Sequence, residues 1–97
     1  MIEAGEVHLA DVGDERQREV LVASPERFTR RSDRALVVPV MVGDFGELSL
    51  PWLIECDGRR FAVDHARTIS VGRLLERTSR ITATDMARVR RVLRLMI

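Results

Sequence analysis

Apolar and polar residues alternate near the start of the chain with the period of two that is typical of a β-strand. In residues 5–12, Val7 and Leu9 fall on one face of such a strand, and the polar Glu6 and His8 fall on the other. This pattern predicts a half-buried strand, with His8 packing at the rim of the fold.

Two further strands are predicted before the middle of the chain. Residues 14–18 contain no apolar side chain and are expected to form an exposed loop. Residues 19–23 then read EVLVA, which predicts the second strand. The run at 36–42 is continuous and rich in valine, as in strands that are covered on both faces.

A short helical turn is predicted between those two strands. Ser24 has a side chain suited to an N-cap, and Pro25 suits the first helical position because its ring fixes φ and it lacks an N–H. Residues 25–29 are therefore expected to form one turn of helix.

The pattern after residue 48 predicts three more strands. Residues 49–56 form a strand with a proline near its start, and the Asp-Gly pair at 57–58 is a strong hairpin signal into a strand at 60–64. Residues 68–75 are expected to form a loop with a brief turn, and residues 77–81 the last strand.

The chain is predicted to end in an amphipathic helix over residues 83–96. Thr82 followed by Asp85 forms a capping box at its start. Its apolar positions recur at helical spacing on one stripe, made of Met86, Val89, Leu93 and Met96. The expected fold is mainly β: a small antiparallel barrel with a C-terminal helix packed on it.

Composition narrows the class of protein. The 97 residues suffice for a single domain, 1–97, and the 45% of hydrophobic and 32% of charged residues are those of an ordinary globular chain. The net charge is only +1, so any nucleic acid must bind a local patch, although all 16 basic residues are Arg. The single Cys cannot form an intramolecular disulfide, and no segment is apolar enough for a signal peptide or a membrane span. A cytoplasmic location without membrane contact is therefore expected.

Several segments together resemble one protein family. GEVHLADVG at 5–13, REVLVASP at 18–25, ALVVPV at 35–40 and DHARTI at 64–69, with the C-terminal helix, resemble the MazF/PemK toxin endoribonucleases. The resemblance implies an SH3-like barrel and cleavage of single-stranded RNA (mRNA) without metal or other cofactor. It also implies a homodimer and a small MazE-like antitoxin as partner.

The resemblance suggests two catalytic residues. Cleavage of this kind needs a group that takes the proton of the ribose 2′-hydroxyl and positive charge for the phosphoryl group. Arg18 stands where the family has its key Arg, and its planar fork suits a phosphate. Glu15, in the preceding loop, is the candidate proton acceptor. The Pro that usually follows the Arg is replaced here by Glu19, which implies a less rigid loop exit and a competing carboxylate.

The same comparison suggests the residues that bind RNA. Asp64, His65 and Arg67 belong to a segment that lies near the RNA groove in the family, and Arg16 lies in the loop before Arg18. His65 has the chemistry to contact a base edge or to carry a proton near neutral pH.

One departure from the family pattern affects the expected activity. Met41 stands where the family has a catalytic Thr, and a thioether cannot donate a hydrogen bond to a phosphate oxygen. Ser24 and Ser49 are the candidate hydroxyl groups to replace it, and core filling is the alternative role of Met41.

Two other readings therefore stay open. The C-terminal half also resembles CcdB, a DNA gyrase poison of the same fold that acts by binding, although its C-terminal Trp-Gly-Ile is absent here. The other alternative is a member of the MazF/PemK family that has lost its catalytic activity and only binds an antitoxin.

The closing helix carries more apolar residues than one stripe needs. Val92, Leu95 and Ile97 lie off that stripe, as expected for a helix that serves both its own barrel and a partner subunit. A two-fold symmetric dimer is the assembly that this surplus predicts.

Overall fold

In the residues that the computed structural model describes (2–13, 16–41 and 50–96), the strands form two antiparallel sheets. The larger sheet has the order β6-β3-β2-β1-β7, and the smaller one pairs β4 with β5. The strands are β1 (Glu6–Ala10), β2 (Arg18–Val22), β3 (Arg34–Pro39), β4 (Leu53–Cys56), β5 (Arg59–Ala62), β6 (Arg67–Ser70) and β7 (Leu74–Arg80). The helices are α1 (Glu26–Ser32) and α2 (Ala83–Met96), with single 3₁₀ turns η1 (Val63–His65) and η2 (Val71–Arg73).

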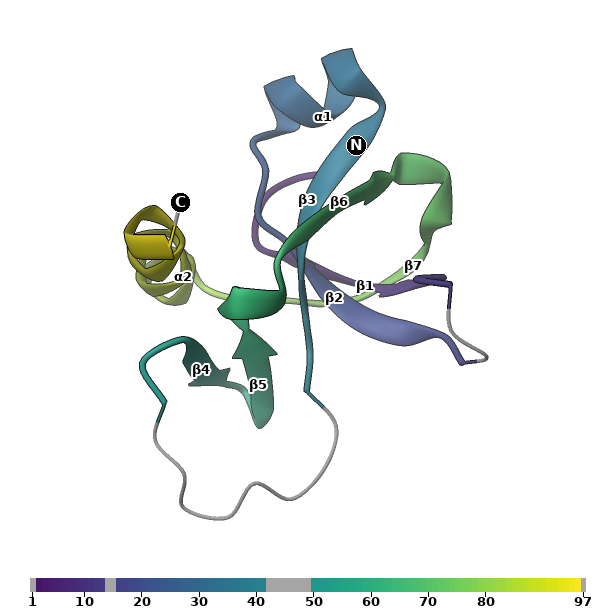
Figure 1. Ribbon diagram of the computed structural model, residues 1–97. Helices are drawn as coiled ribbons and strands as arrows, with labels where there is room; N and C mark the ends of the chain where they lie inside the picture. The colour runs from purple at the N-terminus through teal and green to yellow at the C-terminus, as the bar shows by residue number, and fades with distance from the viewer. Residues whose placement is uncertain (1, 14–15, 42–49, 97) are drawn as a thin grey trace.

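The larger sheet is strongly curled, so that its two end strands β6 and β7 are joined through η2 (Figure 1). Among the described residues, no backbone pairing between β6 and β7 closes this sheet into a complete barrel. The predicted fold, mainly antiparallel β with a C-terminal helix, is confirmed.

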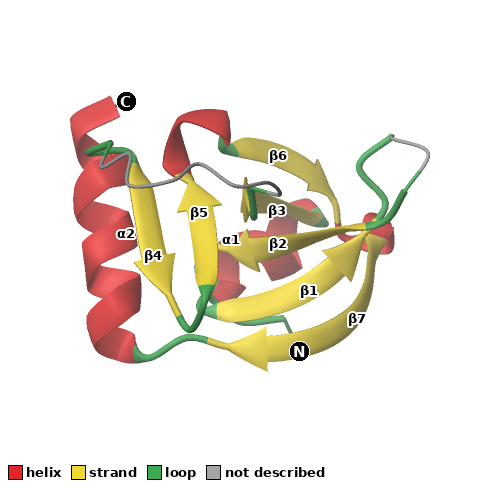
Figure 2. Ribbon diagram, turned by 90° about the horizontal axis from the view of Figure 1, so that it is seen from below, coloured by secondary structure: helices red, strands yellow, loops and turns green. Residues whose placement is uncertain are grey.

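Apolar residues cover both faces of the curled sheet. One cluster fills the inside of the curl and includes Val20 and Val37. The other lies between the outer face and the layer made by α2 and the β4–β5 hairpin, which Figure 2 shows side by side. It includes Leu21 and Val38, the chain neighbours of the first two, because successive strand side chains point to opposite faces. The prediction that the strand around residue 37 is covered on both faces is confirmed; Val42 at its predicted end lies outside the described residues.

The prediction of a half-buried first strand is wrong. Glu6 is 4% exposed and His8 8% exposed, because the face that carries them turns into the curl. Two polar residues therefore lie in the interior, where they must find hydrogen-bond partners.

The helical segment after β2 is longer than the single turn predicted. Helix α1 extends to Ser32 and ends at Asp33, whose φ of 57° is the left-handed cap conformation. The predicted N-cap role of Ser24 is wrong, since Pro25 occupies the cap position without a side-chain bond. The Ser24 hydroxyl instead contacts Thr29 Oγ1 at 2.9 Å and accepts from the Leu36 N–H at 3.1 Å.

The hairpin after residue 50 is confirmed in its turn and shorter in its strands. Asp57 and Gly58 both have positive φ, 53° and 73°, as a two-residue hairpin turn requires. Strand β4 starts only at Leu53, after a turn that contains Pro51. After β5 the chain turns into η1 before residue 64.

The loop predicted at 68–75 is wrong, although the brief turn predicted within it corresponds to η2. Strand β6 occupies this region and pairs with β3 in the register Ala35↔Ile69, although Ile69 is its single buried residue. Strand β7 follows from Leu74 and pairs with β1, and it is longer than the strand predicted at 77–81. Both are edge strands of mostly exposed residues, so backbone pairing rather than an apolar pattern defines them.

The closing helix is confirmed over the predicted residues. The Asp85 N–H donates to Thr82 Oγ1 at 3.1 Å, which is one half of the predicted capping box. Met86, Val89 and Leu93 are buried against the outer cluster, whereas Met96 is 45% exposed.

Candidate functional site

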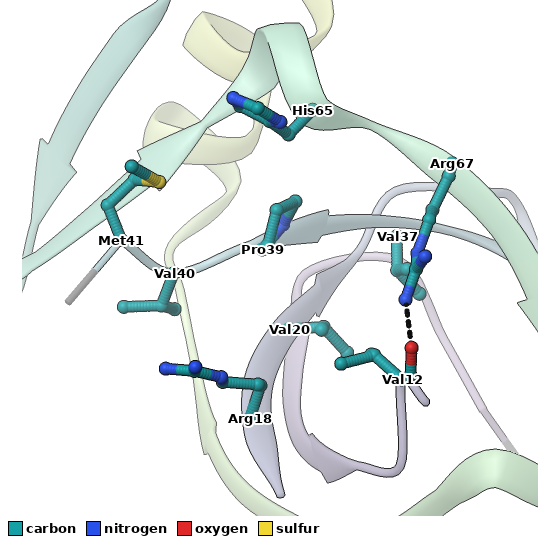
Figure 3. Close-up of a pocket in the computed structure, with 9 residues that line it drawn as sticks. All are labelled: Val12, Arg18, Val20, Val37, Pro39, Val40, Met41, His65 and Arg67. Atoms are coloured by element: carbon teal, nitrogen blue, oxygen red, sulfur yellow. Dashed lines mark hydrogen bonds between the residues drawn. The ribbon is translucent and has the colours of Figure 1, made fainter. Parts of the chain in front are cut away.

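A pocket of about 390 Å³ opens at one end of the curled sheet, next to the start of β2. Its apolar floor belongs to the inner cluster, and its rim carries two arginines and a histidine. It is lined by Val12, Arg18, Val20, Val37, Pro39, Val40, Met41, His65 and Arg67 (Figure 3). Three of the six predicted site residues, and the position at which the family pattern is broken, therefore share one cavity.

Arg18 reaches the pocket because of its place in strand β2. It is the first residue of the strand, pairs with Ala10 of β1, and lies on the same face as Val20. Its half-buried side chain extends toward Val40 and Met41 in Figure 3. A guanidinium above an apolar floor is suited to bind a phosphate there.

Arg67 enters the pocket from β6, the edge strand on the other side of β3 from β2. It is the first residue of β6 and pairs with Val37 of β3. Its Nη2 donates to the backbone carbonyl of Val12 at 2.7 Å, as drawn in Figure 3. The bond ties the end of the β1 segment to β6 and fixes the direction of this second positive charge.

His65 lies across the pocket from Arg18, at the end of η1 (Figure 3). Its side chain is 63% exposed, and its Nε2 is 3.6 Å from Oδ2 of Asp64. The ring nitrogens are therefore accessible to solvent and to a bound ligand.

Met41 is part of the pocket wall and not of the sheet core. Its backbone N–H donates to the Arg60 carbonyl at 2.8 Å, and the preceding Val40 forms an isolated bridge with Phe61. The segment therefore crosses from β3 to β5. The thioether lies among the residues lining the pocket where the family resemblance expects a hydroxyl.

Of the remaining predicted site residues, the two that the structure describes, Arg16 and Asp64, do not line the pocket. Arg16 is exposed in the connection before β2 and is not among the described residues that line the cavity. Glu15 and Ser49 lie outside the described residues. Ser24 is buried in its bonds to Thr29 and Leu36, so it does not replace the missing hydroxyl.

The Glu19 carboxylate lies on the opposite side of β2 from Arg18, and its hydrogen-bond partners differ from the predicted one. Glu19 points to the opposite face of β2, where its carboxylate accepts from Nε and Nη2 of Arg59 at 3.0 to 3.3 Å and from the Thr78 hydroxyl at 2.8 Å. The Arg59 hydrogen bonds lower the pKa of the Glu19 carboxyl; burial opposes this change and Thr78 reinforces it. Glu19 was predicted to compete for Arg18, and Arg59 is the partner it binds across the sheets.

A second polar group, Glu6 and His8, was missed because the first strand was taken as half-exposed. His8 Nε2 donates to Glu6 Oε1 at 2.9 Å, and Arg77 Nη1 lies 3.4 Å from Glu6 Oε2. Burial favours the neutral form of Glu6, but the bonds from His8, from the Glu3 N–H and from Arg77 outweigh it and lower the pKa of the carboxyl. The signal in the sequence was a Glu and a His two residues apart in a strand whose other residues, Val7, Leu9 and Ala10, are all apolar.

Within the described residues, no group of three or more His, Cys, Asp or Glu side chains could hold a metal ion. None of the helices described is long and apolar enough to cross a membrane.

Comparison with known families shows which family the chain belongs to. The sequence model of one family, described as the PemK-like, MazF-like toxins of type II toxin-antitoxin systems, matches residues 3–97. The chain belongs to this toxin family. No curated protein matches its sequence.

Solved structures of low sequence identity share the fold of this PemK/MazF-like toxin. A mycobacterial endoribonuclease in complex with its cognate antitoxin is 15% identical with a TM-score of 0.83, covering 98% of this chain and 93% of that one. A MazE–MazF structure from Deinococcus radiodurans is 21% identical with a TM-score of 0.82 and the same coverage. The toxin MazF-mt6 of Mycobacterium tuberculosis is 18% identical with a TM-score of 0.75, covering 91% of each chain.

Proposed function

We propose that the protein is the toxin of a type II toxin-antitoxin pair and cleaves single-stranded RNA without a metal ion. The observation that carries this proposal is the convergence of Arg18, His65 and Arg67 on one pocket in a chain of the PemK/MazF-like family. Structural relatives that are endoribonucleases, one of them bound to its antitoxin, support it.

The proposed reaction is attack of a ribose 2′-hydroxyl on the adjacent phosphorus. The 2′-oxygen loses its proton, a bond to phosphorus forms, the bond to the 5′-oxygen breaks, and that oxygen takes up a proton. Arg18 stabilises the charge on the phosphoryl oxygens, as a positioned donor does in such sites. Arg67 holds a neighbouring phosphate, since its fork retains donors beyond the one given to Val12.

His65 is the described group best suited to move the proton. A neutral imidazole has one nitrogen that accepts a proton and one that donates it, and this ring is exposed at the pocket rim beside Asp64. Glu15 stays a candidate for the same role from the sequence. Arg16 and Asp64 are proposed to contact RNA outside the cavity.

The partners of the proposed toxin follow from the same family. A MazE-like antitoxin would bind over the pocket and block RNA, and a second copy of the chain would complete the RNA groove. Relatives crystallised with a MazE antitoxin support the first of these proposals.

The decisive experiment measures cleavage of a long single-stranded RNA by the purified protein in the presence of EDTA. Arg18→Ala should lower the single-turnover rate by about 10²- to 10³-fold, as loss of one positioned donor does. Arg91→Ala, on the exposed face of α2 and outside the cavity, is the matched control and should lose far less. Equal rates for the natural chain and Arg18→Ala would contradict the proposal.

Met41 supports a second candidate function. A pocket with a thioether in place of a hydroxyl donor suits a family member that binds its antitoxin but no longer cleaves. Antitoxin binding without any RNA cleavage by the natural chain would favour this candidate. The family match over residues 3–97 is to the PemK-like toxins, and no feature of the described residues favours the gyrase-binding alternative.

A further inference from the structure

Arg18 and Glu19 are neighbours in the chain but serve opposite faces of strand β2. Arg18 lies on the pocket face with Val20, and Glu19 lies on the outer face with Leu21. A contact that restrains the Glu19 side chain therefore also restrains the backbone that carries Arg18, although the contact itself lies outside the pocket.

The Glu19 carboxylate joins its own strand β2 to Arg59 of β5 and to Thr78 of β7. Arg59 Nη2 lies 3.0 Å from Oε2, and Arg59 Nε contacts both oxygens, at 3.2 and 3.3 Å. Thr78 of β7 donates to Oε2 at 2.8 Å. A fork that binds both carboxylate oxygens restrains direction as well as distance, which a single bond does not.

The pair is shielded enough to act as a restraint. The side chains of Arg59 and Glu19 are only 25% and 31% exposed. Solvent and salt weaken fully exposed ion pairs much more than a partly shielded pair of this kind. The same Glu19 hydrogen bonds raise the pKa of Arg59, so both partners keep their charge in the neutral range.

The backbone around the pair connects it to the opposite wall of the pocket. The Val40 N–H donates to the Glu19 carbonyl at 3.0 Å, and the Met41 N–H donates to the Arg60 carbonyl at 2.8 Å. Val40 and Met41 are thus held between the start of β2 and strand β5. The Glu19–Arg59 pair spans the same two strands.

We propose that Glu19 and Arg59 are positioning residues for RNA cleavage: their ion pair locks the start of β2 against the β4–β5 hairpin and so holds Arg18 facing the Val40–Met41 wall. The inference rests on the proposed function. It assigns a catalytic consequence to two residues that touch neither the pocket nor the RNA. A displacement of about 1 Å in such a site can cost 10²-fold in rate.

The test compares kcat and KM for RNA cleavage in Glu19→Ala, Arg59→Ala and Arg59→Lys. Each Ala variant should lower kcat about 10- to 100-fold, because Arg18 loses its preset direction, with a much smaller change in KM. Arg59→Lys keeps the charge and the apolar stem but loses the fork, so its rate should fall between those of the natural chain and Arg59→Ala. This variant also replaces Arg59→Ala should the latter fail to fold.

The matched control removes another Arg–Glu pair. Glu3→Ala breaks the 2.6 Å ion pair with Arg80, which ties the N-terminal segment to β7. It should leave kcat within about twofold, because this pair does not support the pocket.

A double-mutant cycle separates positioning from a purely structural role. If Glu19 acts through Arg18, adding Glu19→Ala to Arg18→Ala should lower the rate no further. Losses that multiply, or Ala variants as active as the natural chain, would overturn the inference while leaving the function intact. Absence of cleavage by the natural chain would instead reject the proposed function, and the positioning role with it.

Discussion

At the scale of single residues, the strand geometry decides which chemistry each side chain can perform. Arg18 and Glu19 differ by one position, yet one enters the pocket and the other binds Arg59 behind it. Met41 is the converse case: it lines the pocket where the family resemblance predicts a hydroxyl donor, and its thioether has the chemistry of a packing residue. Substitutions at these positions therefore separate place from chemistry.

Met41→Thr should raise the rate of RNA cleavage by about 10-fold or more if the missing hydroxyl limits the reaction, since one positioned donor is worth that much or more. Met41→Val is the matched control, because Val has the shape of Thr without the hydroxyl. Single-turnover rates and melting temperatures of the three proteins are compared. A rate for Met41→Thr no higher than that for Met41→Val would show that the hydroxyl is not what the site lacks.

Glu19 should make stability depend on pH in a predictable direction. Its folded pKa lies below the ordinary value of 4.5, so on acidification the unfolded chain takes up the proton first. The stabilisation is thus complete above pH 4.5 and is lost as the pH falls through the folded pKa. The melting temperature of the natural chain should exceed that of Glu19→Gln at neutral pH, and the gap should narrow in acid. A gap that stays constant down to the lowest pH would contradict the ion pair.

At the scale of elements, helix α2 holds the hairpin layer on the outer face of the curled sheet (Figure 2). Its stripe of Met86, Val89 and Leu93 packs on β4 and η1, and η1 carries His65 at its end. Loosening α2 therefore affects the position of the pocket rim as well as the free energy of unfolding.

Leu93→Ala should lower the free energy of unfolding by about 2 to 5 kcal/mol, the usual cost of emptying a buried leucine site. Arg91→Ala, on the exposed side of the same helix turn, should change it by about 0.5 kcal/mol or less. Urea unfolding of both variants measures the difference. Equal midpoints would mean that α2 does not hold the hairpin layer.

At the scale of the whole molecule, helix α2 carries apolar side chains that the core of its own subunit does not bury. Leu95 is 82% exposed and Met96 45% exposed at the end of the helix, while Val92 is partly buried against the core. An apolar helix end of this kind is suited to a second subunit, although single exposed leucines also occur on monomers.

The natural chain should sediment as a dimer at micromolar concentration, and Leu95→Glu should shift it toward the monomer by placing a charge in the apolar contact. Arg91→Glu introduces the same residue one helical turn earlier on the exposed face and serves as the control. Sedimentation of Leu95→Glu as a dimer, or of the natural chain as a monomer that still cleaves RNA, would contradict the model of a groove formed by two subunits.

The sequence by itself determined the elements whose side-chain patterns are local. The period of two located β1, the apolar segment EVLVA located β2, the Asp57-Gly58 pair set the hairpin turn, and Thr82 with the apolar stripe bounded α2. The same segments also placed the chain in its family. Each of these signals arises within a few residues, because strand alternation, turn conformation and helix capping depend on neighbours in the chain.

Tertiary structure alone decided the rest. Strand β6 is defined by pairing with β3, so its own sequence carried little signal. Burial of Glu6 and His8 followed from the curl of the sheet. The ion pair between Arg59 and Glu19, which are 40 positions apart in the chain, followed from the packing of the two sheets. Arg18, His65 and Arg67 were named from family resemblance, but their convergence on one pocket depends on how β2, η1 and β6 meet in space. Contacts between residues that are distant in the chain depend on the whole fold, and no local pattern encodes them.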